Sequence, residues 1–249
     1  TSTGTFDIDT GLITATDKLE TLTLTSDTAT GVVIMSDLAD ADSLTSLTVT
    51  AVGGDITLGE VGGTIGAGSG SGEALATVTV NATAAGDILM DEIWADTTNS
   101  VTDNAMVMTL SADGVGSSVT LDDVWNTFGS TTVNISGDQA VDFSRGTGLL
   151  TADDVTITRS GAGATTIAAI DATDALNVTH NGTGTLTITT SDAEGDTVAT
   201  STSGALAFTS TSTVNVTATG ADGADTLVAS GTTAAGSTHT LSGNGGNDI

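Results

Sequence analysis

The sequence predicts an all-β protein folded as a parallel β-helix, or β-solenoid, with irregular coils of about 21–31 residues. Three observations predict this fold. A short strand in which apolar residues alternate with Thr or Asn recurs along the whole chain, and a second apolar stretch follows about ten residues later. A turn rich in Gly, Asp and Ala lies between the two. Such units bury their apolar faces by stacking, coil upon coil.

The first strand of each unit carries Thr or Asn at every second position, so that half of its side chains face a core and half face water. Thr suits the outward face because its β-branch favours extended backbone. Copies begin at Leu22, Leu47, Val78, Met108, Val133, Val155, Leu176 and Val214, with one longer gap that holds a similar run from Leu186.

The second apolar stretch of each unit is shorter and less polar. It is expected at residues 32–35, 56–58, 88–90, 119–121, 167–170 and 186–188. No segment keeps an apolar stripe at helical spacing beyond two turns, and only residues 90–94 and 121–125 are compatible with short helical turns. The Gly/Ser run at 66–72 is expected to be a flexible surface loop between coils. A string of antiparallel β-sandwich modules is the alternative fold.

Composition limits both the core and the partners. The formal net charge is −28, and the fixed cations are Lys18, Arg145 and Arg159, so nothing here neutralises a nucleic-acid backbone. No apolar run approaches the length of a membrane span. The absence of cysteine excludes disulfides, cysteine-ligated zinc and thiol catalysis. With two Trp, four Phe and no Tyr, the core is expected to consist of Val, Ile, Leu, Ala and Thr.

The last thirty residues contain two glycine-rich turns. Residues 220–228 fit the nonapeptide G-G-x-G-x-D-x-U-x at each defining position except the second, and residues 243–249 fit it with the same departure. The chain resembles the RTX family of calcium-binding repeats, which occur in secreted bacterial toxins, proteases, adhesins and surface-layer proteins. That resemblance implies a parallel β-roll that holds Ca²⁺ between successive turns. Two Asx-type turns without metal are the alternative.

The resemblance implies a set of calcium ligands in these turns. Asp225 and Asp248 would be the leading side-chain ligands, beside backbone carbonyls, within the set Gly220, Asp222, Gly223, Asp225, Gly243, Asn244, Gly246, Asn247 and Asp248. Further acids recur at expected corners, as Asp37/Asp40/Asp42, Asp91/Glu92, Asp122/Asp123 and Asp153/Asp154. These corners have two interpretations that the sequence leaves open: calcium sites between coils, or a solvated acidic edge that keeps strands from aggregating.

The sequence predicts no enzyme. His180 and His239 stand in unrelated contexts and are expected to be solvated turn residues, because neither belongs to an H-E-x-x-H pair. No G-x-S-x-G elbow occurs. Paired carboxylates serve glycoside hydrolysis in some parallel β-helices. Such sites also need aromatic platforms and basic residues, which are scarce here.

These features predict a structural protein of a calcium-stabilised bacterial surface layer (S-layer), secreted to the cell surface, with type I secretion implied by the resemblance. Residues 1–217 would form the solenoid and residues 218–249 the start of a truncated calcium β-roll. Expected partners are further copies of the chain, in a lattice or filament, and cell-surface polysaccharide bound through segments absent from the sequence. The alternatives are the stalk of a large RTX adhesin and, less favoured, a non-catalytic part of an RTX exoenzyme.

Overall fold

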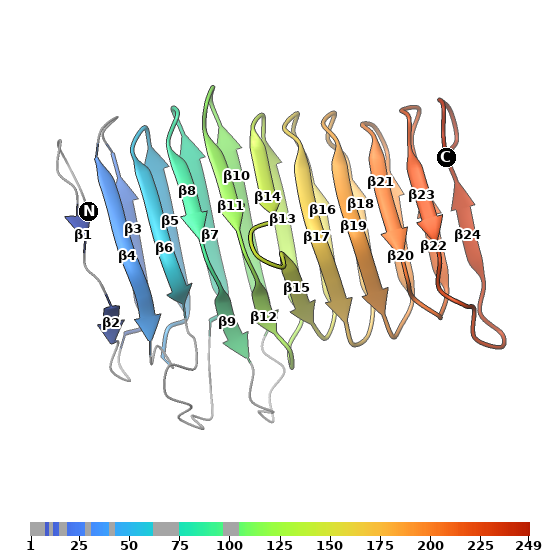
Figure 1. Cartoon of the computed structure of the whole chain (residues 1–249), viewed down its shortest axis with the longest axis horizontal. Coiled ribbons are helices and arrows are strands. Elements are labelled where there is room, and N and C mark those ends of the chain that lie inside the picture. The colour runs from blue at the N-terminus through green and yellow to red at the C-terminus, as the bar shows by residue number, and fades with distance from the viewer. Residues whose placement is uncertain are drawn as a thin grey trace.

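The computed structural model describes residues 8–9, 12–14, 19–27, 31–39, 43–61, 75–96 and 105–249 of the chain. Its regular structure is entirely β, and every strand pair is parallel. Successive coils stack along one axis from the N-terminal to the C-terminal end (Figure 1). Within the described residues there is no helix that could cross a membrane. The all-β parallel solenoid predicted from the sequence is therefore the fold of this chain.

The strands form two sheets, and the chain visits the two sheets alternately. The ten-stranded sheet consists of β3 (Thr21–Ser26), β5 (Ser46–Val52), β7 (Thr77–Thr83), β10 (Met106–Asp113), β13 (Thr131–Gly137), β16 (Val155–Arg159), β18 (Leu176–His180), β20 (Thr197–Ser201), β22 (Val216–Thr219) and β24 (His239–Ser242).

The fourteen-stranded sheet lies across the core from the first. It consists of β1 (Ile8–Asp9), β2 (Leu12–Thr14), β4 (Val32–Ala39), β6 (Asp55–Val61), β8 (Asp87–Met90), β9 (Ile93–Asp96), β11 (Ser118–Leu121), β12 (Val124–Asn126), β14 (Ala140–Phe143), β15 (Leu149–Ala152), β17 (Thr165–Ala172), β19 (Leu186–Ala193), β21 (Leu206–Ser210) and β23 (Thr226–Ala229).

Sheet register confirms the repeat derived from the sequence. Seven of the eight predicted first strands lie in the ten-stranded sheet, and the eighth, expected from Val214, begins two residues later at Val216 in β22. All six predicted second stretches lie in the fourteen-stranded sheet. The shortest coil returns after 19 residues, where Thr197 pairs with Val216. The longest returns after 32 residues, where Ile56 pairs with Ile88 in the fourteen-stranded sheet. Two strands of the ten-stranded sheet, β20 and β24, escaped prediction because Thr-Val-Ala-Thr-Ser and His-Thr-Leu-Ser carry few large apolar residues.

The short helical turns considered for residues 90–94 and 121–125 are wrong. Each segment is instead a break between two strands of the fourteen-stranded sheet, β8 and β9 in one coil and β11 and β12 in the next. The two residues of each break are acidic, and acidic residues are disfavoured in the interior of a strand. The predicted loop at residues 66–72 falls outside the described residues.

The core is a stack of inward side chains from the two sheets. Leu47, Val78, Met108, Val133 and Ile157 lie above one another in consecutive coils, and each is buried. Smaller residues, Ala199 and Ala218, occupy the same column near the C-terminal end. Phe143 and Phe208 fill the facing sheet. Aliphatic residues thus make most of this core, as the scarcity of aromatic residues predicted.

Candidate functional site

The two glycine-rich turns at the C-terminal end stack directly on one another. Strand β22 pairs with β24, so that Val216 lies beside His239 and the following turns are brought into register. Gly220 N–H donates to Ser242 O over 2.7 Å, and Gly245 N–H donates to Ala221 O over 3.2 Å. All nine residues of the predicted ligand set therefore lie in two adjacent turns at one corner of the solenoid.

Asp225 is the buried member of this set, with 1% of its surface exposed. Its Oδ1 accepts a hydrogen bond from Leu206 N–H in the preceding coil over 2.7 Å, and its Oδ2 accepts one from Ala221 N–H over 2.9 Å. Both bonds stabilise the charged carboxylate without a cation. Gly220 is required beside it, because a Cβ there would lie 2.1 Å from Asp225 Oδ2.

The second turn repeats this arrangement with more exposure. Asp248 Oδ1 accepts a hydrogen bond from Asp225 N–H over 3.1 Å, and Asp248 Oδ2 lies against Gly243. The Asn244 side-chain amide donates to Gly220 O over 2.7 Å.

Asp222 is exposed, and its carboxylate lies against Gly245 of the next coil. Gly246 adopts φ of +122°, and its Cα lies close to Gly223 O. Asn247 is exposed at the outer end of this turn.

These residues fit calcium in chemistry, because the set offers only oxygen ligands from carboxylates, amides and backbone carbonyls. Hydrogen bonds and exposure distinguish the members of the predicted ligand set. Asp225 and Gly220 O already accept hydrogen bonds from the protein. Asp222 and Asp248 are the exposed carboxylates that can meet an ion from solvent. The sequence ranked Asp225 and Asp248 equally, whereas burial makes Asp225 the structural acid of the pair.

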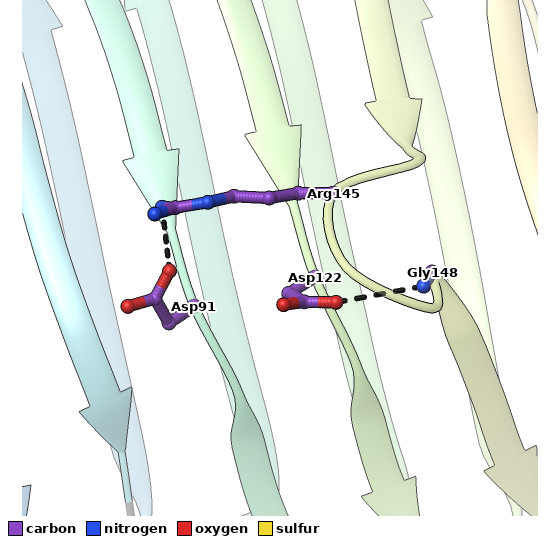
Figure 2. A network of polar contacts seen from close by, with 4 residues as sticks. All are labelled: Asp91, Asp122, Arg145 and Gly148. Atoms are coloured by element: carbon purple, nitrogen blue, oxygen red, sulfur yellow. Dashed lines mark hydrogen bonds and ion pairs between the residues drawn. The ribbon is translucent and has the colours of Figure 1, made fainter.

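A second polar cluster lies where the strands of the fourteen-stranded sheet break. Asp91 and Glu92 separate β8 from β9, and Asp122 and Asp123 separate β11 from β12 in the following coil. Because β9 pairs with β12, these acids come one above the other. We call Asp91, Glu92, Asp122 and Asp123 the acidic corner. The loop that joins β14 to β15 in the next coil closes over it (Figure 2).

Each carboxylate of the acidic corner has a protein partner. Arg145 from the β14–β15 loop forms an ion pair with Asp91, 2.5 Å apart, while Gly148 N–H approaches Asp122 Oδ1 at 3.5 Å (Figure 2). Asp123 accepts Leu149 N–H over 2.7 Å and the Thr147 hydroxyl over 2.7 Å. The acids therefore hold three coils together.

The acidic corner also has aromatic neighbours. Trp94 and Trp125 stack on one another in adjacent coils, with ring centroids 5.3 Å apart and planes 14° from parallel. Trp94 Nε1–H donates to Glu92 Oε2 over 2.9 Å, which ties the stack to the corner. Two of the few aromatic residues of this chain therefore pack against each other.

Burial, together with a neighbouring acid, raises one pKa at this corner. Burial is the main cause that raises the pKa of Asp122 above its usual value, and the neighbouring charge of Asp123 adds to it. The Gly148 N–H opposes the shift because it stabilises the ionised form. A general acid needs a raised pKa together with room for a substrate. Here protein groups from three coils contact the four carboxylates and brace the corner.

A buried polar column runs inside the solenoid toward the glycine-rich turns. It consists of Arg159, His180 and Ser201, which lie in register in consecutive coils and are nearly inaccessible, with Arg159 and His180 at 0% exposure. Arg159 Nε donates to Thr165 Oγ1 over 2.8 Å, and its Nη2 donates to Gly163 O. The prediction that His180 is a solvated turn residue is wrong.

The contacts of His180 set its protonation state. Its Nε2 lies 2.9 Å from Gly184 O, a carbonyl that can only accept, so Nε2 carries the proton of the neutral ring. Burial lowers the pKa of His180, and the positive charge of Arg159 in the preceding coil lowers it further. Burial likewise lowers the pKa of Arg159. His239, the other histidine, is partly exposed, and its Nε2 lies 3.1 Å from Val214 O.

Sequence reasoning missed the acidic corner as a braced unit and the buried polar column altogether. The alternation of β16 and β18 places Arg159 and His180 at inward positions, and that signal was present in the sequence. Charged and ionisable side chains are rarely buried, and this rule outweighed the inward positions that the strand alternation indicates for Arg159 and His180. The doublet Asp153/Asp154 does lie at a corner, where Ala175 N–H donates to Asp154 Oδ1 over 3.1 Å. Asp40 and Asp42 fall outside the described residues.

The sequence matches no family model, no curated protein and no solved structure.

Proposed function

We propose that this chain is a structural, non-catalytic segment of a calcium-stabilised extracellular assembly of the surface-layer type. The observation that carries the proposal is the stacking of two Gly-x-Asp turns, Gly220–Asp225 on Gly243–Asp248, at one corner of a highly acidic solenoid. Calcium prefers hard oxygen ligands and tolerates irregular geometry, and this corner collects such ligands from two coils.

Charge supports the same role for calcium. A chain with a net charge of −28 repels itself, and that repulsion opposes the compact state. Cations that bind only the folded chain stabilise it by mass action. On this proposal the chain remains poorly folded where calcium is scarce, as in the cytosol, and completes its fold after export to a medium rich in calcium. Asp222 and Asp248 bind the ion, and Asp225 holds the turn in shape.

The bracing of the acidic corner supports a non-catalytic role. Arg145, Thr147, Leu149 and Trp94 occupy carboxylates that a hydrolase would keep free for substrate and water. A long stack of coils would also suit the stalk of an adhesin. The two proposals share the same fold and differ in whether copies of the chain assemble into a layer. Growth of the purified chain into sheets favours the surface layer, and a calcium-dependent monomer favours the stalk.

The test is a calcium titration of the chain followed by circular dichroism and light scattering, with Mg²⁺ as the ion control. We compare wild type with the double variant Asp222→Asn/Asp248→Asn. The matched control is Asp171→Asn/Asp192→Asn, which removes the same charge from exposed positions of β17 and β19. The control separates specific binding from general relief of repulsion.

We expect the calcium concentration at the midpoint of the transition to rise at least about tenfold in the turn variant, the equivalent of about 1.4 kcal/mol. The charge-matched control should stay near wild type. Equal midpoints in the two double variants, or an equal response to Mg²⁺, would show that calcium acts only by screening and would refute the proposed site.

A further inference from the structure

The acidic residues of this protein are divided unequally between its two sheets. The ten strands of the ten-stranded sheet, all within the described residues, contain a single acid, Asp113 at the end of β10. The strands of the fourteen-stranded sheet contain nine, at Asp9, Asp37, Asp55, Glu60, Asp87, Asp96, Asp142, Asp171 and Asp192. A protein with a net charge of −28 thus has one broad face whose strands are almost without charge.

The outward positions of that face form ranks that run along the solenoid. One rank is Thr23, Thr48, Thr79, Thr109, Asn134, Thr158, Thr179, Thr200, Thr219 and Ser242. The rank beside it is Thr21, Ser46, Thr77, Val107, Thr132, Thr156, Asn177, Val198, Thr217 and Thr240. We call these two ranks the threonine face.

The threonine face mixes hydroxyl groups with exposed methyl groups. Val107 is 40% exposed and Val198 39%, so two large apolar side chains lie on a surface where water solvates them poorly. Each Thr adds a methyl group and a hydroxyl that both donates and accepts a hydrogen bond. Such a surface is complementary to itself, because every donor can meet an acceptor of the same kind.

The area and the charge of the threonine face indicate which partner would bind to it. Ten strands about 4.8 Å apart and on average about 19 Å long cover roughly 800 Å². That is about the area that each partner buries in a stable protein interface. Another copy of this chain meets strong repulsion at the corners and at the fourteen-stranded sheet, where carboxylates are exposed. Among the two sheet faces of the described residues, the threonine face is the one at which two copies approach without bringing many like charges together.

We propose that two copies of the chain associate through their threonine faces, back to back, with the acidic sheets turned outward. The contact is isologous, so a two-fold axis relates the copies. The inference rests on the self-association that the proposed function includes, and it names the surface. Because the face itself carries no calcium ligand, this contact forms without calcium once salt screens the remaining charge.

Sedimentation velocity on the whole chain tests the contact, in EDTA with added salt and, separately, in calcium. The variant Thr109→Asp/Thr158→Asp places two charges at outward positions in β10 and β16. The matched control Thr120→Asp/Thr187→Asp places two charges at outward positions of β11 and β19 in the opposite sheet. Circular dichroism confirms that both variants keep the β fold.

We expect wild type and control to form dimers, and the threonine-face variant to dissociate at least about 100-fold more readily, because like charges face each other across the axis. A wild type that stays monomeric in EDTA and salt over a broad concentration range overturns the inference, as does equal weakening in both variants. Failure of calcium to change the fold refutes the proposed function instead, since the EDTA arm is read without calcium.

Thiol protection supplies a second readout in a chain that has no native cysteine. Thr158→Cys on the threonine face should react with a thiol reagent at least about tenfold more slowly in the dimer than after dilution to monomer. Thr120→Cys on the opposite sheet should react at one rate in both states. Equal reactivity of Thr158→Cys in dimer and monomer would place the contact elsewhere and overturn the inference.

Discussion

Asp225 and Asp248 lie one above the other in adjacent coils, and the N–H of Asp225 donates a hydrogen bond to Oδ1 of Asp248 over 3.1 Å. Asp225 in turn accepts the N–H of Leu206 from the coil before it. Each of these acids therefore continues the inter-coil ladder with its side chain at a corner where the backbone leaves the sheet. Their first role is to join coils, and the proposed calcium role is added to it.

The bridge made by Asp225 predicts a loss of stability that does not depend on calcium. Asp225→Ala leaves the buried N–H groups of Leu206 and Ala221 without acceptors, at about 1–3 kcal/mol for each group. In EDTA with added salt, which screens the repulsion between carboxylates and keeps the chain folded, we expect the free energy of unfolding in urea to fall by about 2–4 kcal/mol. Asp222→Ala, at an exposed position of the same turn, should change it by less than about 0.5 kcal/mol in EDTA. Equal losses would contradict the structural role of Asp225.

Because stacked turns approach each other closely, replacing Gly161 should destabilise the fold. Gly161 has φ of +90°, and a Cβ there would lie 2.2 Å from Gly137 O in the preceding coil. Gly161→Ala should therefore lower the free energy of unfolding by about 2–4 kcal/mol, from strain and overpacking together. Gly236 has φ of +94° with nothing within 4 Å of the added Cβ, so Gly236→Ala measures the backbone strain alone. A Gly161→Ala loss no larger than that of Gly236→Ala would show that the coils separate easily.

Burial of His180 predicts a stability that falls in mild acid. Its pKa is lowered in the folded state, so the unfolded chain binds a proton more readily. The stabilising contribution is fully present above the ordinary histidine pKa of about 6.5 and is lost as the pH falls below it, by at most about 1.4 kcal/mol per pH unit. Urea unfolding between pH 7 and 5 measures this slope.

The variant His180→Ser removes this titration and copies Ser201, the residue at the same position of the next coil. It should be less stable at pH 7 but show a flatter dependence on pH between 7 and 5. If the unfolding free energies of wild type and His180→Ser fall equally between pH 7 and 5, groups other than His180 cause the acid sensitivity.

Repulsion at the acidic corner predicts a stabilising substitution. The raised pKa of Asp122 means that its ionised form is disfavoured in the folded state. Asp122→Asn removes the charge beside Asp123 and keeps an oxygen for Gly148 N–H, so the urea midpoint at pH 7 should rise. The gain should vanish as the pH falls below the ordinary Asp pKa of 3.8, because Asp122 of the wild type is then protonated in both the folded and the unfolded state. Asp91→Asn instead loses the ion pair with Arg145 and should not stabilise.

The repeat of this protein was predictable because its signal is local. Alternation of Thr with Val, Leu or Ile decides which side chains turn inward. Seven of the eight predicted first strands and all six second stretches lie in strands, and the eighth begins two residues late, at Val216. Where the inward residues shrink to alanine, as in β20, the same local signal weakens, and that strand was missed.

Contacts between coils were not predictable, because the number of residues per coil varies from 19 to 32 and sets which residues meet. The ion pair of Arg145 with Asp91 joins residues from different coils, and only the register of the sheets brings them together. The same holds for the stacking of Trp94 on Trp125. For the glycine-rich turns, the sequence named the residues, and the register decided that they stack.

The sequence by itself determined the all-β class, the solenoid repeat, the aliphatic core and the acidic character, because each follows from residue type and short-range periodicity. The tertiary structure alone decided that Asp225 is buried while Asp222 stays exposed, and that Arg159 and His180 share the interior. It also decided that one sheet is nearly free of acids. These properties depend on which coils lie next to each other, and loop lengths set that register only in the folded chain.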